Sequence, residues 1–158
     1  DDLTSNKAIV RHGAKIKSVR DNAAFVLDLA KEHGSFGAFL ADWPTGDQVG
    51  LWTVLSKRGS RLGGNTGRYF LRFIGADVFL PSRDVVRAVR IAGLDVPEEP
   101  TAKRDMKAIE ELFNTWHEET GLPYVQLSRI CAVSAGDNID PQRLAAYTGV
   151  GSLEGDDS

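Results

Sequence analysis

The stretch that decides the fold is Arg58-Gly59-Ser60-Arg61-Leu62-Gly63-Gly64-Asn65-Thr66-Gly67, which separates two segments of helical periodicity. It is too rich in glycine for a helix interior, and glycine adopts backbone angles that other residues avoid. Its single large apolar side chain, Leu62, predicts a buried anchor. The first N–H groups of the helix that follows have no partner within that helix. The stretch therefore predicts a hairpin between two helices, spanning residues 58–68, whose amides can donate hydrogen bonds to an anion.

Helical periodicity continues on both sides of this hairpin, and no segment alternates apolar and polar residues for long, so we predict an all-α fold. Residues 1–150 are expected to form a single helical domain, and residues 151–158 a flexible tail. In the first helix, the expected buried stripe comprises Ile16, Val19, Ala23, Val26, Leu27 and Ala30. The expected helices cover residues 14–33, 35–43, 47–57, 68–74, 81–92, 102–120, 124–135 and 140–147, with Thr101 as the N-cap of the sixth.

Several aromatic residues and the one cysteine are expected in the core. Trp43, Trp52 and Trp116 lie on apolar stripes, and Cys131 lies in an apolar helix. For Tyr69 and Phe70, which follow the hairpin, packing in the core is favoured over wedging into DNA.

The charges are distributed unevenly. The chain of 158 residues has a formal net charge of −3, yet no acidic residue lies between Asp47 and Asp77. Five basic residues fall in that interval: Lys57, Arg58, Arg61, Arg68 and Arg72. Because salt limits each charge to about 8–10 Å, a local patch matters more than the total. The sequence therefore predicts a basic surface around the hairpin.

Composition also limits the cellular setting and the chemistry. No apolar run approaches the length of a membrane span and the N-terminus is not of the signal-peptide type, so we expect a cytoplasmic protein with no membrane partner. With one cysteine, and with His12, His33 and His117 scattered, no metal site is expected.

Two interpretations of the hairpin stay open. In the first, the amides of residues 63–67 (Gly63, Gly64, Asn65, Thr66 and Gly67) bind a phosphate of double-stranded DNA, aided by Arg61 and Arg68. In the second, the hairpin is a structural corner whose arginines face solvent. The glycines match neither GxGxxG nor GxxxxGK[ST], so they do not indicate a nucleotide-binding loop.

Four stretches resemble the DNA-3-methyladenine glycosylase I family of the helix-hairpin-helix DNA glycosylase superfamily. Residues 10–16 (Val-Arg-His-Gly-Ala-Lys-Ile) are similar to the family's Arg-Asn-x-x-Lys-Ile segment, and residues 33–40 to its Gly-Ser-Phe segment. Lys57-Arg58-Gly59, Gly64-Asn65-Thr66 and Tyr69 resemble its hairpin, and Asp84-Val85-Val86 falls in the helix after it. From Pro97 onward the likeness rests on helical pattern alone.

The resemblance implies a helix-hairpin-helix DNA glycosylase-like helical domain that extrudes an alkylated base, such as 3-methyladenine, and hydrolyses its N-glycosidic bond. It implies DNA contacts at Arg11 and Lys15, although these could instead hold helix packing. No redox or nucleotide cofactor is implied, and a monovalent cation could sit on the hairpin carbonyls. A monomer is expected.

The catalytic position is less well matched. The superfamily's catalytic aspartate aligns with Ser82, which could simply cap a helix, and Asp84 is the nearest carboxylate. Asp84 could equally be a first-turn acid that favours the helix dipole. The family's base pocket and its zinc site are not matched here. The pocket lies upstream of the first motif, so it comes from residues before Asp1, comes from another chain, or is lacking.

Three functions are therefore compatible with the sequence. The first is a DNA repair glycosylase for alkylated bases. The second is a non-catalytic helix-hairpin-helix DNA-binding module that has lost the pocket. The third is a helical interaction domain whose arginines face solvent.

Overall fold

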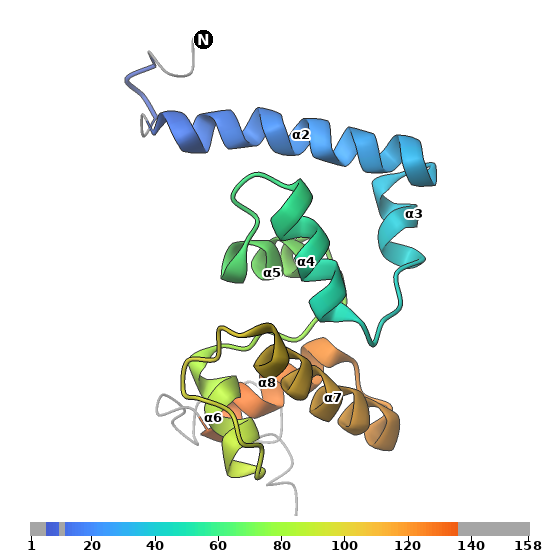
Figure 1. The fold of residues 1–158 in the computed structure, drawn as a ribbon, viewed down its shortest axis with the longest axis vertical. Helices are drawn as coiled ribbons and strands as arrows, with labels where there is room; N and C mark the ends of the chain where they lie inside the picture. The colour runs from blue at the N-terminus through green and yellow to red at the C-terminus, as the bar shows by residue number, and fades with distance from the viewer. Residues whose placement is uncertain (1–5, 10–11, 136–158) are drawn as a thin grey trace, which may run out of the picture.

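The computed structural model describes residues 6–9 and 12–135, and every regular element in that part is a helix (Figure 1). The helices are α2 (Gly13–His33), α3 (Phe36–Ala41), α4 (Gln48–Arg58), α5 (Gly64–Phe73), α6 (Arg83–Ile91), α7 (Lys103–Thr120) and α8 (Tyr124–Ala135). The all-α prediction is confirmed for these residues. Arg11, the expected helix 140–147 and the tail 151–158 lie outside the described residues.

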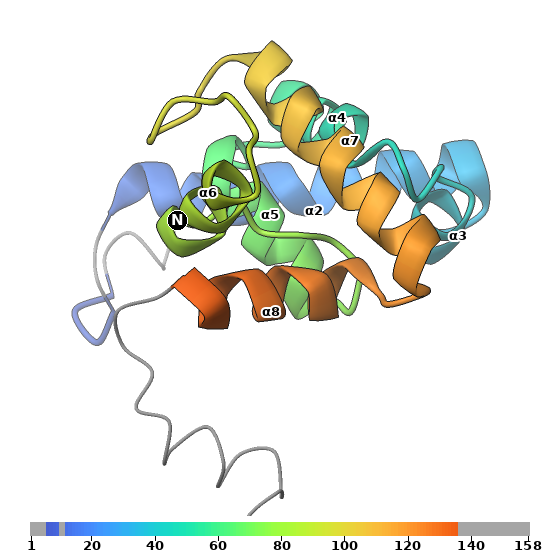
Figure 2. The same ribbon diagram turned by 90° about the horizontal axis from the view of Figure 1, so that it is seen from below.

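The helices follow one another from one end of the molecule to the other (Figure 1). The long α2 lies across one end and packs with α3, while α4 and α5 occupy the middle. At the other end α6 packs against α8, and α7 contacts both α4 and α8 (Figure 2). The hairpin between α4 and α5 thus lies between α2 and the C-terminal helices.

Aromatic rings hold these groups of helices together. Phe79 and Phe113 stack with their centroids 4.5 Å apart, and Trp52 meets Phe79 edge-on at 5.0 Å. All three side chains are buried, which joins α4, the α5–α6 connection and α7. On the other side, Phe36 lies 6.1 Å from Phe70 and so attaches α3 to α5. Offset and edge-on ring pairs of this kind add about 0.5–1.5 kcal/mol each beyond the burial of area.

The expected core residues are largely confirmed. Trp52 and Cys131 are buried, and Trp43 and Trp116 are half-buried against the core. Burial raises the pKa of the Cys131 thiol, as expected for an inert side chain. The prediction for the residues after the hairpin is half wrong, because Phe70 packs on the core but Tyr69 is exposed.

Side-chain caps set most of the helix starts. His12, Ser35, Asp47 and Ser82 each accept a hydrogen bond from a backbone N–H in the first turn of the helix they precede. The cap predicted at Thr101 is wrong, since α7 begins one residue later, after Ala102, which offers no side-chain cap. The predicted bounds of α3, α4 and α8 agree with the structure to within two residues at each end.

The predicted buried face of α2 is wrong in part: Val26 packs against the core, but other members of the stripe do not. Phe25 and Leu29 are the buried residues of this helix, whereas Val19 is 70% exposed and Leu27 61% exposed. Apolar residues occur on more than one side of α2, so periodicity alone does not identify the inner face. Phe25 lies on the inner face because it packs against the ring of Phe36, with the two ring centroids 6.3 Å apart.

Helix α5 begins at Gly64, four residues before the predicted start at Arg68. The four glycines of residues 59–67 led to the prediction of a longer loop. Two of them, Gly64 and Gly67, instead form part of the first turn of the helix. The hairpin itself is correspondingly tighter, with residues 59–63 connecting the two helices.

Candidate nucleic-acid interface

The hairpin closes on a single buried side chain. Leu62 is buried, and its carbonyl oxygen approaches Gly67 so closely that a Cβ atom on Gly67 would collide with it. A Cβ on Gly59 would lie 2.6 Å from Leu62 Cδ1 and 2.7 Å from the carbonyl oxygen of Leu55. Two glycines are therefore required by contact alone, and the predicted role of Leu62 as the anchor is confirmed.

Two residues of the hairpin adopt left-handed backbone angles. Gly64 has φ +57°, and Arg61 has φ 60°, the only positive φ of a non-glycine residue in the described part. A left-handed angle costs a residue with a Cβ atom about 1–2 kcal/mol. The strain at Arg61 is tolerated because the rest of the hairpin is fixed by packing.

The amides of the hairpin are open. No described residue accepts a hydrogen bond from the backbone N–H groups of residues 61–66. Arg61, Gly63, Gly64, Asn65 and Thr66 are all exposed, and the N-cap Gly63 provides no side chain to occupy the helix start. The α5 N-terminus thus presents unpaired donors to solvent, with the positive end of the helix dipole behind them.

Helix α2 holds the hairpin from behind through Asn22. The Asn22 side chain accepts a hydrogen bond from the Ser60 backbone N–H at 2.7 Å and donates one to the Ser60 carbonyl oxygen at 2.9 Å. This pair satisfies Ser60 inside the protein and leaves the amides that follow it free. Sequence reasoning missed Asn22, and the only available signal was a polar residue close to the buried positions of α2.

The basic residues near the hairpin differ in their availability. Arg58 makes two hydrogen bonds to the Glu32 carboxylate, at 2.8 and 2.5 Å, which lower the pKa of that carboxyl group. Arg72 is half-buried, its Nε has no partner in the described part, and burial lowers its pKa. Arg61 and Lys57 are exposed and make no hydrogen bond or ion pair with described residues. The free charge near the hairpin therefore comes from Arg61 and Lys57.

Arg68 turns inward, away from the place where a phosphate was expected to meet it. Its guanidinium lies 4.4 Å from the centre of the Trp52 ring and donates to Asn65 Oδ1 at 3.0 Å. Another nitrogen of the group contacts the sulfur of Met106 at 3.5 Å, and burial lowers the pKa of Arg68. Arg68 thus holds the Asn65 side chain in place, and its own positive charge is partly buried below the hairpin.

The remaining predicted site residues lie apart from one another. Lys15 is exposed in the first turn of α2, and Ser82 caps α6 through a 3.3 Å hydrogen bond from the Val85 N–H. Asp84, in the first turn of α6, is half-exposed and makes no hydrogen bond or ion pair with described residues. Asp84 is therefore a carboxylate without a structural partner in the described part, whereas Ser82 has a structural role.

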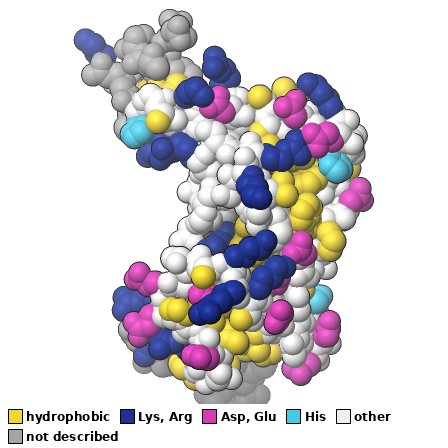
Figure 3. Space-filling model, in the orientation of Figure 1, with side chains coloured by type: hydrophobic (Ala, Val, Ile, Leu, Met, Phe, Trp, Pro, Cys, Tyr) yellow, Lys and Arg dark blue, Asp and Glu magenta, His cyan; other side chains and the backbone are white. Residues whose placement is uncertain are grey.

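Basic side chains gather across the middle of one face, between α2 and α6, and the outline of the molecule is hollowed there on one side (Figure 3). Acidic side chains lie mostly nearer the edges of that face (Figure 3). This arrangement agrees with the acid-free interval of the sequence, from Asp47 to Asp77.

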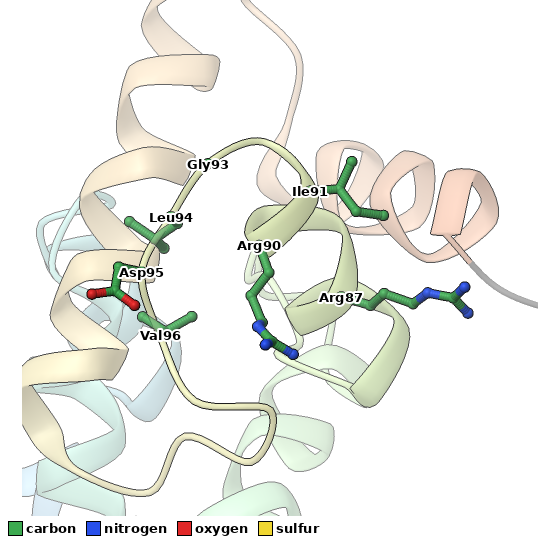
Figure 4. Close-up of a pocket in the computed structure, with 7 residues that line it drawn as sticks. All are labelled: Arg87, Arg90, Ile91, Gly93, Leu94, Asp95 and Val96. Atoms are coloured by element: carbon green, nitrogen blue, oxygen red, sulfur yellow. The ribbon is translucent and has the colours of Figure 1, made fainter.

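Two concave regions lie away from the hairpin. The larger, about 470 Å³, lies beside the end of α6; Arg90 reaches across it and pairs with Glu98 at 3.1 Å, while Arg87 points away (Figure 4). The other, about 330 Å³, lies among α3, α4 and the α5–α6 connection and includes Trp43. Its Asp77 carboxylate is already occupied by the backbone N–H groups of Tyr124 and Val125. In the larger region the exposed Asp95 carboxylate makes no hydrogen bond or ion pair with described residues.

Within the described residues, no three or more His, Cys, Asp or Glu side chains cluster in a way that could hold a metal ion. None of the described helices is long and apolar enough to cross a membrane. Among the hairpin carbonyls, that of Ser60 accepts a hydrogen bond from the Asn22 side chain.

Comparisons with protein-family models, with curated proteins and with solved structures gave no match for this chain.

Proposed function

We propose that this protein binds the phosphate backbone of double-stranded DNA through the hairpin between α4 and α5. One observation carries the proposal: six consecutive backbone N–H groups, of residues 61–66, have no acceptor in the described part and lie in the end of the hairpin and the first turn of α5. Such donors suit the oxygens of a phosphate, and the exposed guanidinium of Arg61 adds charge attraction. Contacts of this kind position a protein on a duplex without reading its sequence.

The test of backbone binding is a titration with duplex DNA at low salt, followed by amide NMR. The amide signals of residues 61–66 should shift. The amides of Tyr124 and Val125, which also begin a helix but donate to Asp77, should not. Equal shifts at both helix starts, or none at the hairpin, would contradict the proposal.

A charge variant provides a second measurement. Arg61→Ala should reduce the slope of log K against log salt concentration by about 1, because one phosphate contact is lost. Lys31→Ala is the matched control: it removes the same charge from the far end of α2, where Lys31 pairs with Asp28. The control should keep the slope of the unaltered protein.

We further propose that the bound DNA is a repair substrate and that the protein hydrolyses the N-glycosidic bond of an alkylated base. The support is the likeness of four stretches to the DNA-3-methyladenine glycosylase I family and the unengaged carboxylate of Asp84 on the helix after the hairpin. A carboxylate there would stabilise the positive charge that develops on the sugar as the base departs. A cationic base such as 3-methyladenine is already a good leaving group, so little further assistance is needed.

Release of free base from methylated DNA tests the enzymatic proposal. The longest natural form of the protein should release base, and Asp84→Asn should lower the rate without changing duplex affinity. If that form binds DNA and releases no base, the alternative of a non-catalytic DNA-binding module replaces the glycosylase.

A further inference from the structure

Helix α5 carries an exposed pair of stacked aromatic rings. Tyr69 is 45% exposed and Phe73 84% exposed, and their rings lie nearly parallel, 28° apart, with centroids separated by 6.1 Å. The next residue, Ile74, is 46% exposed. Phe73 is the most exposed large apolar side chain in the described part. The outer part of its ring is free to accept another flat group.

The pair lies on the same face of α5 as the open hairpin. Asn65, Tyr69 and Phe73 are four residues apart in turn, which places them in one row along a helix. Their row runs about 12 Å along the axis from the start of the helix, at 1.5 Å per residue. Asn65 is exposed at the hairpin end, where Arg68 holds its side chain. A strand bound by the hairpin amides and directed along α5 would therefore pass over the aromatic pair.

The charge around the pair favours a nucleic-acid strand over an apolar protein surface. No carboxylate belongs to α4, α5 or the hairpin between them, whereas Lys57, Arg58, Arg61, Arg68 and Arg72 do. Phosphates next to a stacked base would meet no like charge from these elements. An apolar protein surface would gain no attraction from this excess of positive charge.

We propose that Tyr69 and Phe73 form a stacking platform for unpaired bases, so that the protein binds single-stranded DNA along α5. The proposal rests on the proposed function, because it takes the hairpin as the place where the strand's phosphates are held. Bases within a continuous duplex have both faces covered by their neighbours and cannot stack on a side chain. Unpaired bases stack on aromatic side chains whatever their identity.

The test compares affinities for a labelled oligodeoxythymidine and for a duplex of the same length, measured by fluorescence anisotropy. Phe73→Ala should weaken binding of the single strand roughly 5- to 150-fold, the range of loss of one stacked base. Binding of the duplex should change less than about twofold, because phosphate contacts remain. Phe73→Trp should restore single-strand binding, and its fluorescence should be quenched by the strand.

Ile91→Ala is the matched control. Ile91 is 73% exposed but lies on α6, so its removal deletes a similar exposed apolar group away from the row. The control should leave both affinities unchanged. Circular dichroism should show all variants folded, since neither side chain is buried.

The outcomes separate this inference from the function on which it rests. If Phe73→Ala leaves single-strand affinity unchanged, or weakens single strand and duplex equally, the stacking platform is wrong while duplex binding stands. If Phe73→Ala changes only the sedimentation mass of the free protein, the aromatic pair is a contact between copies and the inference is likewise overturned. If the unaltered protein binds neither the single strand nor the duplex, the proposed function is overturned as well.

Discussion

Two helices of this protein, α5 and α8, begin in opposite ways. The first amides of α8 donate to the Asp77 carboxylate, from Tyr124 N–H at 3.1 Å and from Val125 N–H at 2.8 Å, although Asp77 lies 47 residues upstream. The amides at the start of α5 have no acceptor in the described part. One helix start is closed by a distant acid, and the other is left open.

The start of α5 is open because no side chain near it accepts a hydrogen bond from its first amides. Asn65 and Thr66 lie in the first turn of α5, yet the Asn65 side-chain oxygen already accepts a hydrogen bond from Arg68. The N-cap itself is Gly63, which has no side chain. Helix α7 also lacks a side-chain cap, but it carries Asp105 in its first turn, whereas the first turn of α5 has no acid. The difference is that α8 begins at a joint closed within the fold, whereas α5 begins with donors that no described residue occupies.

The largest effect that we expect at the open start comes from its closest backbone contact. Gly67→Ala should destabilise the protein by about 2 kcal/mol, because the new Cβ atom would push the Leu62 carbonyl away and open the hairpin. Denaturant unfolding followed by circular dichroism gives the value.

Gly63→Ala is the matched control for that substitution. Its Cβ would meet only the hydroxyl of Ser56, at 3.3 Å, and that side chain can rotate. A loss at Gly63 as large as the loss at Gly67 would show that the contact with Leu62 does not close the hairpin.

Substitutions of Asp77, which closes the start of α8, should lower stability and leave DNA binding unchanged. Asp77→Ala should cost about 1–2 kcal/mol, the usual cost of removing a helix cap, because two amides of α8 lose their acceptor. Asp77→Asn should lose less, since the amide oxygen can still accept one hydrogen bond. Duplex titrations of the same variants should show an unchanged salt slope; a reduced slope would place α8 in the DNA interface.

A smaller effect is expected at the strained residue of the open start. Arg61→Gly should raise stability by about 0.5 kcal/mol, because relief of the left-handed angle exceeds the entropy that glycine loses on folding. The same variant should weaken duplex binding as Arg61→Ala does. Thermal unfolding in parallel with a salt titration measures both. A glycine variant less stable than the alanine variant would mean that the left-handed angle carries no strain.

The smallest expected effect concerns Arg58. Unlike Arg61, it is hydrogen-bonded to a carboxylate, that of Glu32. Its hydrogen bonds lower the pKa of Glu32, whose ordinary value is 4.5. Because the folded pKa lies below the unfolded one, the stability that this pair contributes is present above pH 4.5 and is lost as pH falls through the folded pKa. In Arg58→Ala, an NMR titration should find the Glu32 pKa back near its ordinary value. An unchanged pKa would mean that Arg58 does not engage Glu32 in solution.

The sequence by itself determined the helical elements and the position of the hairpin, because both depend on near neighbours. Apolar spacing, the caps at Asp47 and Ser82, and the glycines of residues 59–67 act within a few residues of where they stand. That the glycine-rich stretch leaves amides without partners could be predicted for the same reason, although the residue at which α5 begins could not. The carboxylate of Asp84 and the exposed charge of Arg61 also follow from local pattern.

Only the tertiary structure decided which groups meet across the chain. It turned Arg68 onto Trp52, tied Arg58 to Glu32, fixed the hairpin through Asn22 and closed α8 with Asp77. It also chose the inner face of α2 and exposed Tyr69 and Phe73. None of these outcomes has a local signal, because an arginine, an aspartate or an aromatic ring has the same short-range preferences whether its partner lies across the core or in the solvent.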